Sequence, residues 1–328
     1  MPDETNSQSN TQPTAETAAA ADVAAEAAAD PVADSTADPT ADPAASCDSA
    51  CSSCAADCTS RSEPQDWHAK PNDFTQIKQI IAVVSGKGGV GKSLVTSTLA
   101  CALQAQGKQV GILDADITGP SVPKAFGVSE KLRANVAGLL PSVSAGGIQV
   151  VSTNLILPED TTPVLWRGTI ISGLVRQFFS EVTWGELDYL LIDMPPGTGD
   201  VPLTVYQSLP INGVVVVTAP QALVSMIVGK AINMAATMNV PILGLVENLS
   251  YFQCPDCGNR HDIFGPSQLD ALAKEYNITL TARLPIDSNY ASLMDSGQIE
   301  QAQIPEITAF ATTLSAELEA TTNSTTDA

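Results

Sequence analysis

Short runs of Val, Ile and Leu recur from about residue 75 onward, and segments with helical spacing lie between them. Runs of this kind are typical of strands that are buried on both faces, as in a parallel sheet. The pattern predicts strands over residues 79–85, 110–114, 148–152, 189–193, 214–218 and 242–247. It predicts helices over residues 92–106, 201–208, 222–238 and 266–276. This alternation indicates an α/β fold with a mostly parallel central sheet flanked by helices.

The two ends of the chain lack this pattern. Residues 1–46 hold nine acidic side chains, no basic one and no aromatic one. Such a segment cannot bury enough apolar surface to offset the entropy of ordering it, so we expect a disordered, Ala-rich acidic tail. A four-cysteine segment over 47–58 and a polar linker over 59–74 come next. We expect one folded domain over 75–318 and a second disordered tail over 319–328.

Charge and hydropathy exclude several classes of partner. The formal net charge is −21, and removal of the nine acids of the first tail still leaves −12. A nucleic-acid-binding protein needs clustered Lys and Arg to displace counterions from phosphates, and this chain has no such cluster. No apolar run approaches the roughly 20 residues of a membrane span, and the N-terminus lacks the features of a signal peptide. We therefore expect a cytoplasmic protein that binds neither nucleic acid nor membrane.

A glycine-rich segment follows the first predicted strand and precedes the first predicted helix, which is the context of a P-loop. Its glycines let successive backbone N–H groups face phosphates, and the helix N-terminus adds its positive dipole end. We expect Lys92 to contact the β and γ phosphates of ATP and the Ser93 hydroxyl to ligate Mg²⁺. The expected ATP-binding residues of this loop are Gly86, Lys87, Gly88, Gly89, Val90, Gly91, Lys92 and Ser93.

The second lysine of this loop, Lys87, resembles that of the deviant P-loop in the MinD and ParA class of ATPases. The resemblance implies that Lys87 reaches across a dimer to the partner's nucleotide, so a monomer would turn over slowly. In the same way it implies that Asp116 positions the attacking water and that Asp114 supports the metal side. A solvated surface lysine is the alternative interpretation of Lys87.

A further acidic residue ends a predicted strand. Asp193 closes the strand over 189–193 and is followed by a Met-Pro-Pro-Gly segment that contains Gly197. A carboxylate at the carboxyl end of a parallel strand beside a P-loop is where a Walker-B Asp holds Mg²⁺, and Gly197 is placed to sense the γ-phosphate.

The seven cysteines form two clusters and one isolated residue. In a reducing compartment thiols stay free unless they bind metal or do redox work, so both clusters are candidate metal sites. Cys254 and Cys257 supply two thiolates, whereas a tetrahedral metal or a cubane cluster needs four ligands. A symmetric homodimer would supply four. The second cluster could ligate a whole cluster within one chain and consists of Cys47, Cys51, Cys54 and Cys58; the isolated Cys101 is expected in the core.

The order of motifs GKGGVGKS, LDADITGPS, WRG, LDYLLIDMPPGTGD, VTAP, VENLSYFQCPDCG and IFG resembles the Mrp family of iron-sulfur cluster carrier ATPases. The resemblance covers about residues 75–300. It implies a homodimer with a 4Fe-4S cluster bridging Cys254 and Cys257 of both protomers. It also implies upstream cluster donors and apo iron-sulfur client proteins as partners. Asn248, Pro285 and Asp287 would lie near the adenine.

Other interpretations stay open at this stage. The cysteine pair could hold a structural zinc ion in a nucleotide-binding module, or could be a redox pair, although its Pro-Asp core does not favour redox work. A MinD-like switch that dimerises on ATP is the alternative for the whole chain. Such a switch needs a basic amphipathic end helix to dock on a membrane, and residues 304–328 are instead acidic and Thr-rich.

Overall fold

The computed structural model describes residues 68–117, 119–157, 168–220 and 224–326. The expected acidic tail 1–46, the four-cysteine segment 47–58 and most of the linker 59–74 lie outside the described residues. Within the described ranges, no helix has the length and apolar character needed to cross a membrane.

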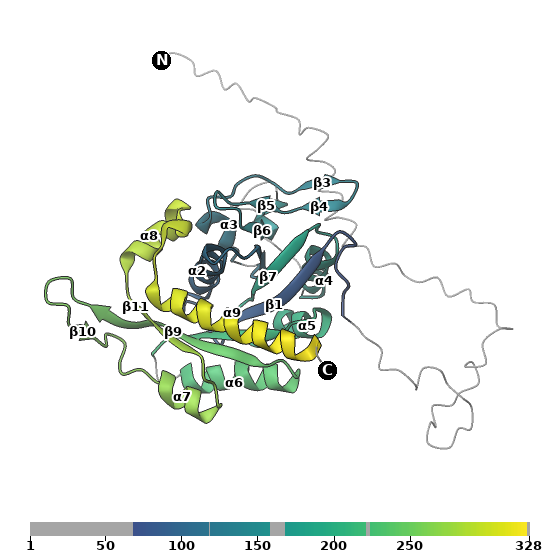
Figure 1. Cartoon of the computed structure of the whole chain (residues 1–328). Helices are drawn as coiled ribbons and strands as arrows, with labels where there is room; N and C mark the ends of the chain where they lie inside the picture. The colour runs from purple at the N-terminus through teal and green to yellow at the C-terminus, as the bar shows by residue number, and fades with distance from the viewer. Residues whose placement is uncertain (1–67, 118, 158–167, 221–223, 327–328) are drawn as a thin grey trace, which may run out of the picture.

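Within this part of the chain, one nine-stranded sheet forms the centre of the molecule (Figure 1). The strand order is β10-β9-β8-β1-β7-β2-β6-β5, and β11 pairs with β9. All pairs are parallel except the two at β5 and β10. The strands are β1 (Gln76–Ser85), β2 (Val110–Asp114), β5 (Ser142–Val143), β6 (Gln149–Val151), β7 (Glu186–Asp193), β8 (Gly213–Thr218), β9 (Ile242–Gln253), β10 (Arg260–His261) and β11 (Thr281–Pro285). A separate hairpin joins β3 (Arg133–Asn135) to β4 (Gly138–Leu140).

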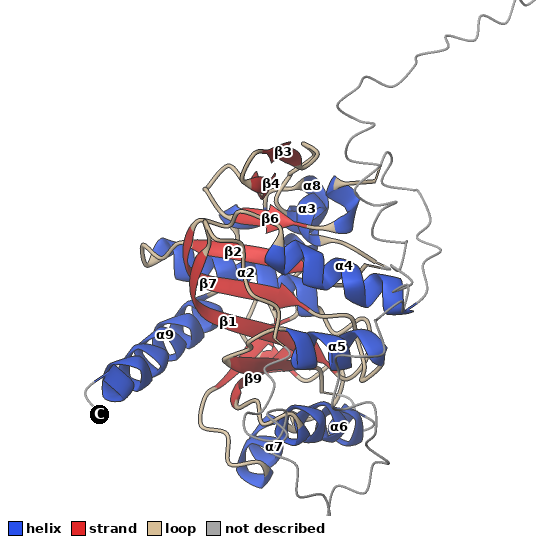
Figure 2. Ribbon diagram, turned by 90° about the vertical axis from the view of Figure 1, so that its right-hand side faces the viewer, coloured by secondary structure: helices blue, strands red, loops and turns tan. Residues whose placement is uncertain are grey.

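Helices cover both faces of the sheet (Figures 1 and 2). One face carries α2 (Lys92–Ala105), which packs against α9 (Pro305–Thr326). The other face carries α4 (Gly168–Ser180), α5 (Asp200–Ser208) and α6 (Val224–Thr237). The remaining helices are α3 (Val122–Ala125), α7 (Leu269–Glu275), α8 (Ser288–Ser296) and the short 3-10 turns Thr153–Leu155 and Ile299–Gln301. The mostly parallel α/β fold predicted from the sequence is confirmed.

The connections place a binding site at the carboxyl ends of the central strands. β1 lies between β7 and β8. From β1 the chain passes through α2 to β2, on the β7 side of β1. From β7 it passes through α5 to β8, so this connection crosses the sheet in the opposite direction. Ligands of open α/β sheets bind where the strand order reverses in this way. In register, Asp193 pairs with Val83 on one side and with Asp114 on the other, so the acidic strand ends meet at this point.

Several elements differ from the sequence-based prediction. β1 begins at Gln76, before the predicted start at residue 79. Its first residues alternate between exposed and partly buried positions, so they do not form the continuous apolar run on which the prediction depended. β9 continues to Gln253, so Asn248 lies inside the strand instead of after it. The predicted tail over 319–328 is wrong for residues 319–326, because α9 continues to Thr326.

Candidate functional site

The P-loop connects β1 to α2 at the carboxyl edge of the sheet. Gly89 and Gly91 have φ angles of 79° and 81°, a left-handed conformation that favours glycine. A Cβ atom on Gly86 would come within 2.4 Å of Ile227 Cγ2, so only glycine fits there without a shift of α6. The glycine spacing is therefore required both by the turn and by the packing beneath it.

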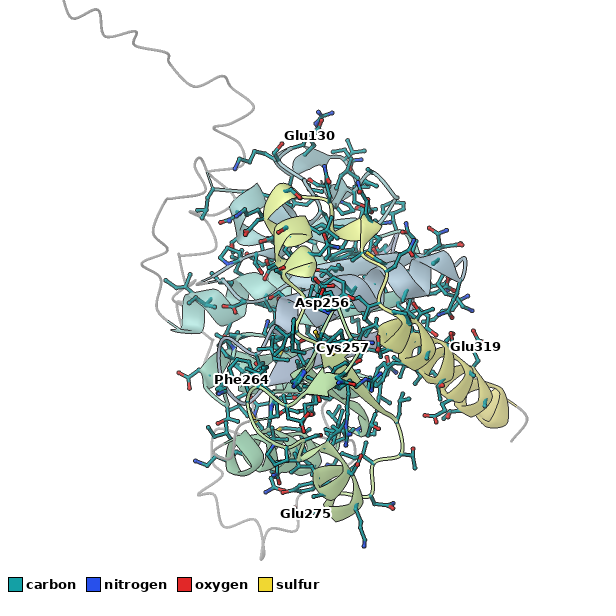
Figure 3. All side chains as sticks on the ribbon, turned by 90° about the vertical axis from the view of Figure 1, so that its left-hand side faces the viewer. Glu130, Asp256, Cys257, Phe264, Glu275 and Glu319 are labelled. Atoms are coloured by element: carbon teal, nitrogen blue, oxygen red, sulfur yellow. The ribbon has the colours of Figure 1, made fainter. Side chains whose placement is uncertain are left out.

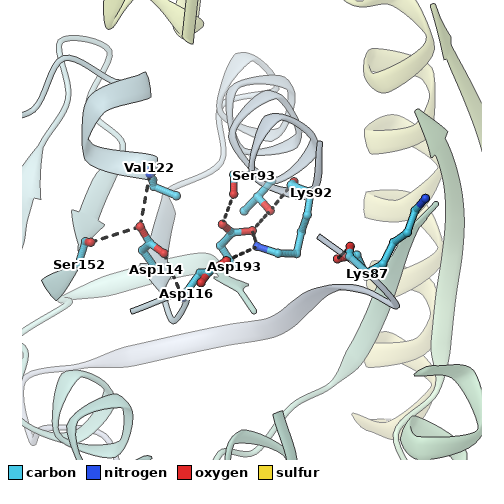
Figure 4. Close-up of polar contacts among 10 residues, drawn as sticks. Lys87, Lys92, Ser93, Asp114, Asp116, Val122, Ser152 and Asp193 are labelled. Atoms are coloured by element: carbon cyan, nitrogen blue, oxygen red, sulfur yellow. Dashed lines mark hydrogen bonds and ion pairs between the residues drawn. The ribbon is translucent and has the colours of Figure 1, made fainter. Parts of the chain in front are cut away.

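Asp193, at the end of β7, is fully buried and accepts three side-chain hydrogen bonds (Figure 4). Lys92 Nζ donates to Oδ1 at 2.7 Å, and Ser93 Oγ donates to Oδ2 at 2.6 Å. Thr96 Oγ1, one turn further along α2, donates to Oδ1 at 2.7 Å. The structure thus brings together the three residues that sequence motifs assigned to phosphate and Mg²⁺. It adds Thr96, which the motifs did not indicate. The position of Thr96 one helical turn after Lys92 is the feature of the sequence that could have predicted this contact.

Asp114, at the end of β2, is buried and anchors the loop that follows it. It accepts hydrogen bonds from Asp116 N at 3.2 Å, Val122 N at 3.3 Å and Ser152 Oγ at 3.2 Å. Burial raises the pKa of the Asp114 carboxyl to about 8, and repulsion from Asp193 acts in the same direction. Through its hydrogen bonds to Asp116 N and Val122 N, the Asp114 side chain holds the loop that carries Asp116.

Asp116 and Lys87 lie on opposite sides of the buried ion pair. Asp116 Oδ2 is 4.0 Å from Lys92 Nζ, and Asp116 lines a cavity beside the P-loop. The Lys87 side chain points away from Lys92 and Asp193 in Figure 4. Its backbone oxygen accepts a hydrogen bond from Ser85 Oγ at 3.0 Å, which fixes the turn.

A cavity of about 460 Å³ opens beside the P-loop, within the size range of small-molecule sites. Its lining includes all three residues assigned to the adenine, together with five residues of β9 and α8 that the motifs did not indicate: Leu249, Tyr290, Ala291, Met294 and Asp295. Asn248 Nδ2 donates to Val90 O at 2.9 Å. The Asp287 side chain accepts from Asn289 N at 2.8 Å and caps α8.

The backbone N–H of Gly197 donates a hydrogen bond within the protein. Gly197 has a φ angle of 89° and donates to Ser85 O at 2.9 Å. In this arrangement the bond ties the loop after β7 to the end of β1.

The cysteine pair lies in the turn of the hairpin formed by β9 and β10, with Gln253 opposite Arg260. Cys254 N donates to Asn259 O and Gly258 N donates to Cys254 O, both at 2.9 Å. The N–H groups of Cys257 and Asp256 face the Cys254 sulfur, and they lower the pKa of that thiol, with a contribution from the Cys257 side chain. Figure 3 shows Asp256 and Cys257 on the same face of the molecule as Phe264. The turn is therefore built to hold a thiolate at the surface.

The ligand set of this hairpin is incomplete within one chain. Among the described residues, no group of three or more His, Cys, Asp or Glu side chains could hold a metal ion. Cys101 lies in α2 against the core, and burial raises the pKa of its thiol to about 12. It was expected in the core, and it is a partly buried residue at the edge of the core. The other cluster, Cys47, Cys51, Cys54 and Cys58, lies outside the described residues.

The fold, the loop and its buried lysine–aspartate pair define a P-loop nucleoside triphosphatase. The chain matches the family model described as ParA, NUBPL iron-transfer P-loop NTPase, over residues 76–318. That match spans most of the chain, and the chain belongs to this family. The resemblance to iron-sulfur cluster carrier ATPases that the motifs indicated is confirmed.

Individual relatives agree with this assignment. An iron-sulfur cluster carrier protein of Methanocaldococcus jannaschii is 48% identical over 235 residues, which cover 71% of this chain and 81% of that protein. One of Saccharolobus solfataricus is 49% identical over 224 residues, or 68% of this chain and 76% of that protein.

Two solved structures show what this chain resembles at high and at low sequence identity. A nucleotide-binding protein of Archaeoglobus fulgidus, solved in complex with ADP, is 46% identical with a TM-score of 0.64, covering 70% of this chain and 90% of that one. The cell division ATPase MinD of Pyrococcus furiosus has a TM-score of 0.53 at 21% identity and covers 74% of this chain and 99% of that one, a likeness of fold.

Proposed function

We propose that this protein is an ATP-binding and ATP-hydrolysing carrier that receives an iron-sulfur cluster from an upstream donor and passes it to apo-proteins. The observation that supports this most strongly is the hairpin of Cys254 and Cys257. It presents two surface thiols without a third ligand from the described chain, at the same edge of the sheet as the P-loop. The names of the two relatives, both iron-sulfur cluster carrier proteins, support the same function.

The donors around Asp193 fit the phosphates and Mg²⁺ of bound ATP. The Ser93 hydroxyl and the Asp193 carboxylate are hard oxygen ligands of the kind that Mg²⁺ prefers, and they lie 2.6 Å apart. Mg²⁺ would neutralise charge on the β and γ phosphates. Lys92 Nζ would exchange its contact with Asp193 for those phosphates. The ADP complex of the Archaeoglobus fulgidus protein supports a nucleotide at this site.

Hydrolysis in this proposal depends on two residues with separate tasks. Asp116 lines the cavity within 4.0 Å of Lys92 Nζ, where it would orient the attacking water. Lys87 is directed away from its own Asp193, which suits contact with the nucleotide of a second protomer. Basal turnover would be slow, because each site lacks its second cation, the partner's Lys87, until the dimer forms.

The cluster is the cargo, and two copies of the hairpin would hold it. A 4Fe-4S cluster takes four thiolates, so two protomers would bridge one cluster with Cys254 and Cys257 of each. Three exposed apolar side chains lie within ten residues of the pair in the sequence, Phe252, Ile263 and Phe264. They would exclude water around the bridging cluster. We further propose that Cys47, Cys51, Cys54 and Cys58 hold a second cluster in each chain, which acts as donor or acceptor for the bridging one.

A MinD-like switch is less well supported for this chain. Docking on a membrane requires a basic amphipathic helix, whereas α9 contains neither Lys nor Arg. Among the described residues, we find no observation that favours a switch over a carrier.

Transfer of a cluster to an acceptor tests the proposal. The protein is reconstituted anaerobically and mixed with an apo-ferredoxin, and appearance of the holo-ferredoxin spectrum is followed with and without ATP and Mg²⁺. We expect transfer by the wild type and by the matched thiol control Cys101→Ser. Cys257→Ser should transfer less, and only the cluster held by the N-terminal cysteines. Equal transfer by Cys257→Ser and wild type would overturn the assignment of the hairpin.

A further inference from the structure

One strand joins the nucleotide cavity to the cysteine hairpin. Asn248 lies in the middle of β9, and Cys254 follows directly after the last residue of the same strand, Gln253. Asn248 is buried, and its Nδ2 donates to the P-loop carbonyl of Val90 at 2.9 Å. A Cβ atom on Gly91 would lie 2.1 Å from that nitrogen, so the glycine allows the amide to reach the loop.

Between Asn248 and the hairpin, the backbone of β9 adopts a conformation that its side chain disfavours. Leu249 has a φ angle of 57°, in the left-handed region, which is sterically unfavourable for a side chain with a Cβ atom. The register with β11 shifts here, because Glu247 pairs with Arg283 whereas Tyr251 pairs with Pro285. β9 therefore has two more residues than β11 over this stretch, a bulge centred on Leu249. Leu249 also lines the nucleotide cavity.

Polar contacts hold the two ends of the bulge. Ser250 Oγ donates to Glu247 Oε2 at 2.6 Å, and Gln268 N donates to Glu247 Oε1 at 3.2 Å. Tyr251 O accepts from Ile286 N at 2.7 Å. These contacts mark the two ends of the bulge, and the peptides around Leu249 are the segment of β9 between the P-loop contact of Asn248 and the cysteine hairpin.

We propose that Asn248 is a positioning residue that holds the P-loop through Val90. We further propose that the left-handed bulge at Leu249 transmits the position of the loop along β9 to Cys254 and Cys257. This inference rests on the proposed function, since it explains how nucleotide and cluster sites affect each other. Strain at a functional site can keep two conformations close in free energy. The contact of Asn248 with Val90 then selects one of them, and phosphate binding changes that contact.

The test measures thiol exposure in the full-length protein without a cluster. Iodoacetamide alkylation of Cys254 and Cys257 is followed by peptide-resolved mass spectrometry, without nucleotide and with Mg²⁺ and ATP at a saturating concentration set from each variant's own Kd. In the wild type we expect ATP to change the alkylation rate of at least one of the two by about fivefold or more, the lower end of typical coupling between linked sites. Asn248→Asp, which replaces the donor with an acceptor of the same shape, should lose this response.

Leu249 provides a matched pair of variants. Leu249→Ala keeps a Cβ atom and therefore the disfavoured backbone, so it should keep the response to ATP. Leu249→Gly removes the steric cost of the left-handed conformation, so the bulge would stay in place whatever the P-loop does, and the response should be lost. This pair keeps the inference testable where the Asn248 variant fails to fold.

The possible outcomes separate this inference from the proposed function. A wild type that binds ATP and incorporates iron, but whose alkylation rates ignore ATP, overturns the inference and leaves the carrier function standing. Equal responses of Leu249→Gly and Leu249→Ala overturn the role of the backbone conformation. Absence of ATP binding by the wild type overturns both.

Discussion

Lys92 Nζ lies 2.7 Å from Asp193 Oδ1, and both side chains are almost completely buried. The lysine of the P-loop is thus held by the carboxylate at the end of β7. This pair explains how a cation and an anion can be kept inside the site before phosphates arrive. Lys92 therefore contributes to the stability of the fold as well as to nucleotide binding.

Lys92→Ala should weaken ATP binding by about 100-fold or more, because it removes charge-assisted contacts to two phosphates. It should also lower the free energy of unfolding by about 3 kcal/mol, since Asp193 is left as an unpaired buried charge. Calorimetric titration and urea denaturation measure the two effects. The double variant Lys92→Met with Asp193→Asn removes both charges, and we expect it to regain stability but not ATP affinity. Wild-type ATP affinity in Lys92→Ala would contradict the assignment of the phosphate site.

Lys87→Ala should bind ATP with little change and lose turnover by about 1,000-fold, the size of the effect of a cation supplied in trans in other P-loop enzymes. Asp116→Ala should likewise bind ATP without turnover. Mixing the two variants should restore part of the activity, because one site of each mixed dimer has both intact residues. Lys78→Ala, at the exposed start of β1, is the control and should keep wild-type turnover. Mixed dimers that form but show no recovery would contradict action across the dimer.

Stability should depend on pH through Asp114. Burial raises the pKa of this carboxyl from its ordinary value of 3.8 to about 8. The folded protein therefore binds more protons than the unfolded chain between these values, so the contribution is complete below pH 3.8 and is lost as pH rises toward 8. Urea denaturation without nucleotide or Mg²⁺, at several values between pH 5 and pH 8, should show a smaller decline for Asp114→Asn than for wild type. Identical declines would mean that Asp114 is not the responsible group.

The thiols should differ in reactivity according to their surroundings. Burial raises the pKa of Cys101 to about 12, whereas backbone N–H groups lower the pKa of Cys254. Because the thiolate is the nucleophile, we expect Cys254 to be alkylated at pH 8 at least about 100-fold faster than Cys101. Peptide-resolved alkylation of the apo-protein measures both. Comparable rates would show that the hairpin does not stabilise a thiolate.

The sequence predicts the central strands and the phosphate loop well, because continuous apolar runs and the glycine–lysine motif are local signals. β2 was predicted with its observed bounds. Helix α9 was not predicted as an element, although Ile307, Phe310 and Leu314 are buried at helical spacing; its many Thr residues obscured the pattern. The bulge at Leu249 could not be predicted, because it depends on pairing with β11, a strand more than 30 residues further along. The same holds for Ser152, which reaches Asp114 only through the sheet.

The central claim is that Cys254 and Cys257 of two protomers hold one iron-sulfur cluster. The direct measurement is iron, sulfide and zinc content, together with dimer mass, after anaerobic reconstitution of the full-length chain with Cys47, Cys51, Cys54 and Cys58 all replaced by Ser. We expect about four irons and four sulfides per dimer, retained in a further Cys101→Ser variant and lost in a further Cys254→Ser variant. One zinc ion per dimer without sulfide would contradict the carrier function and assign the hairpin to a structural zinc site instead.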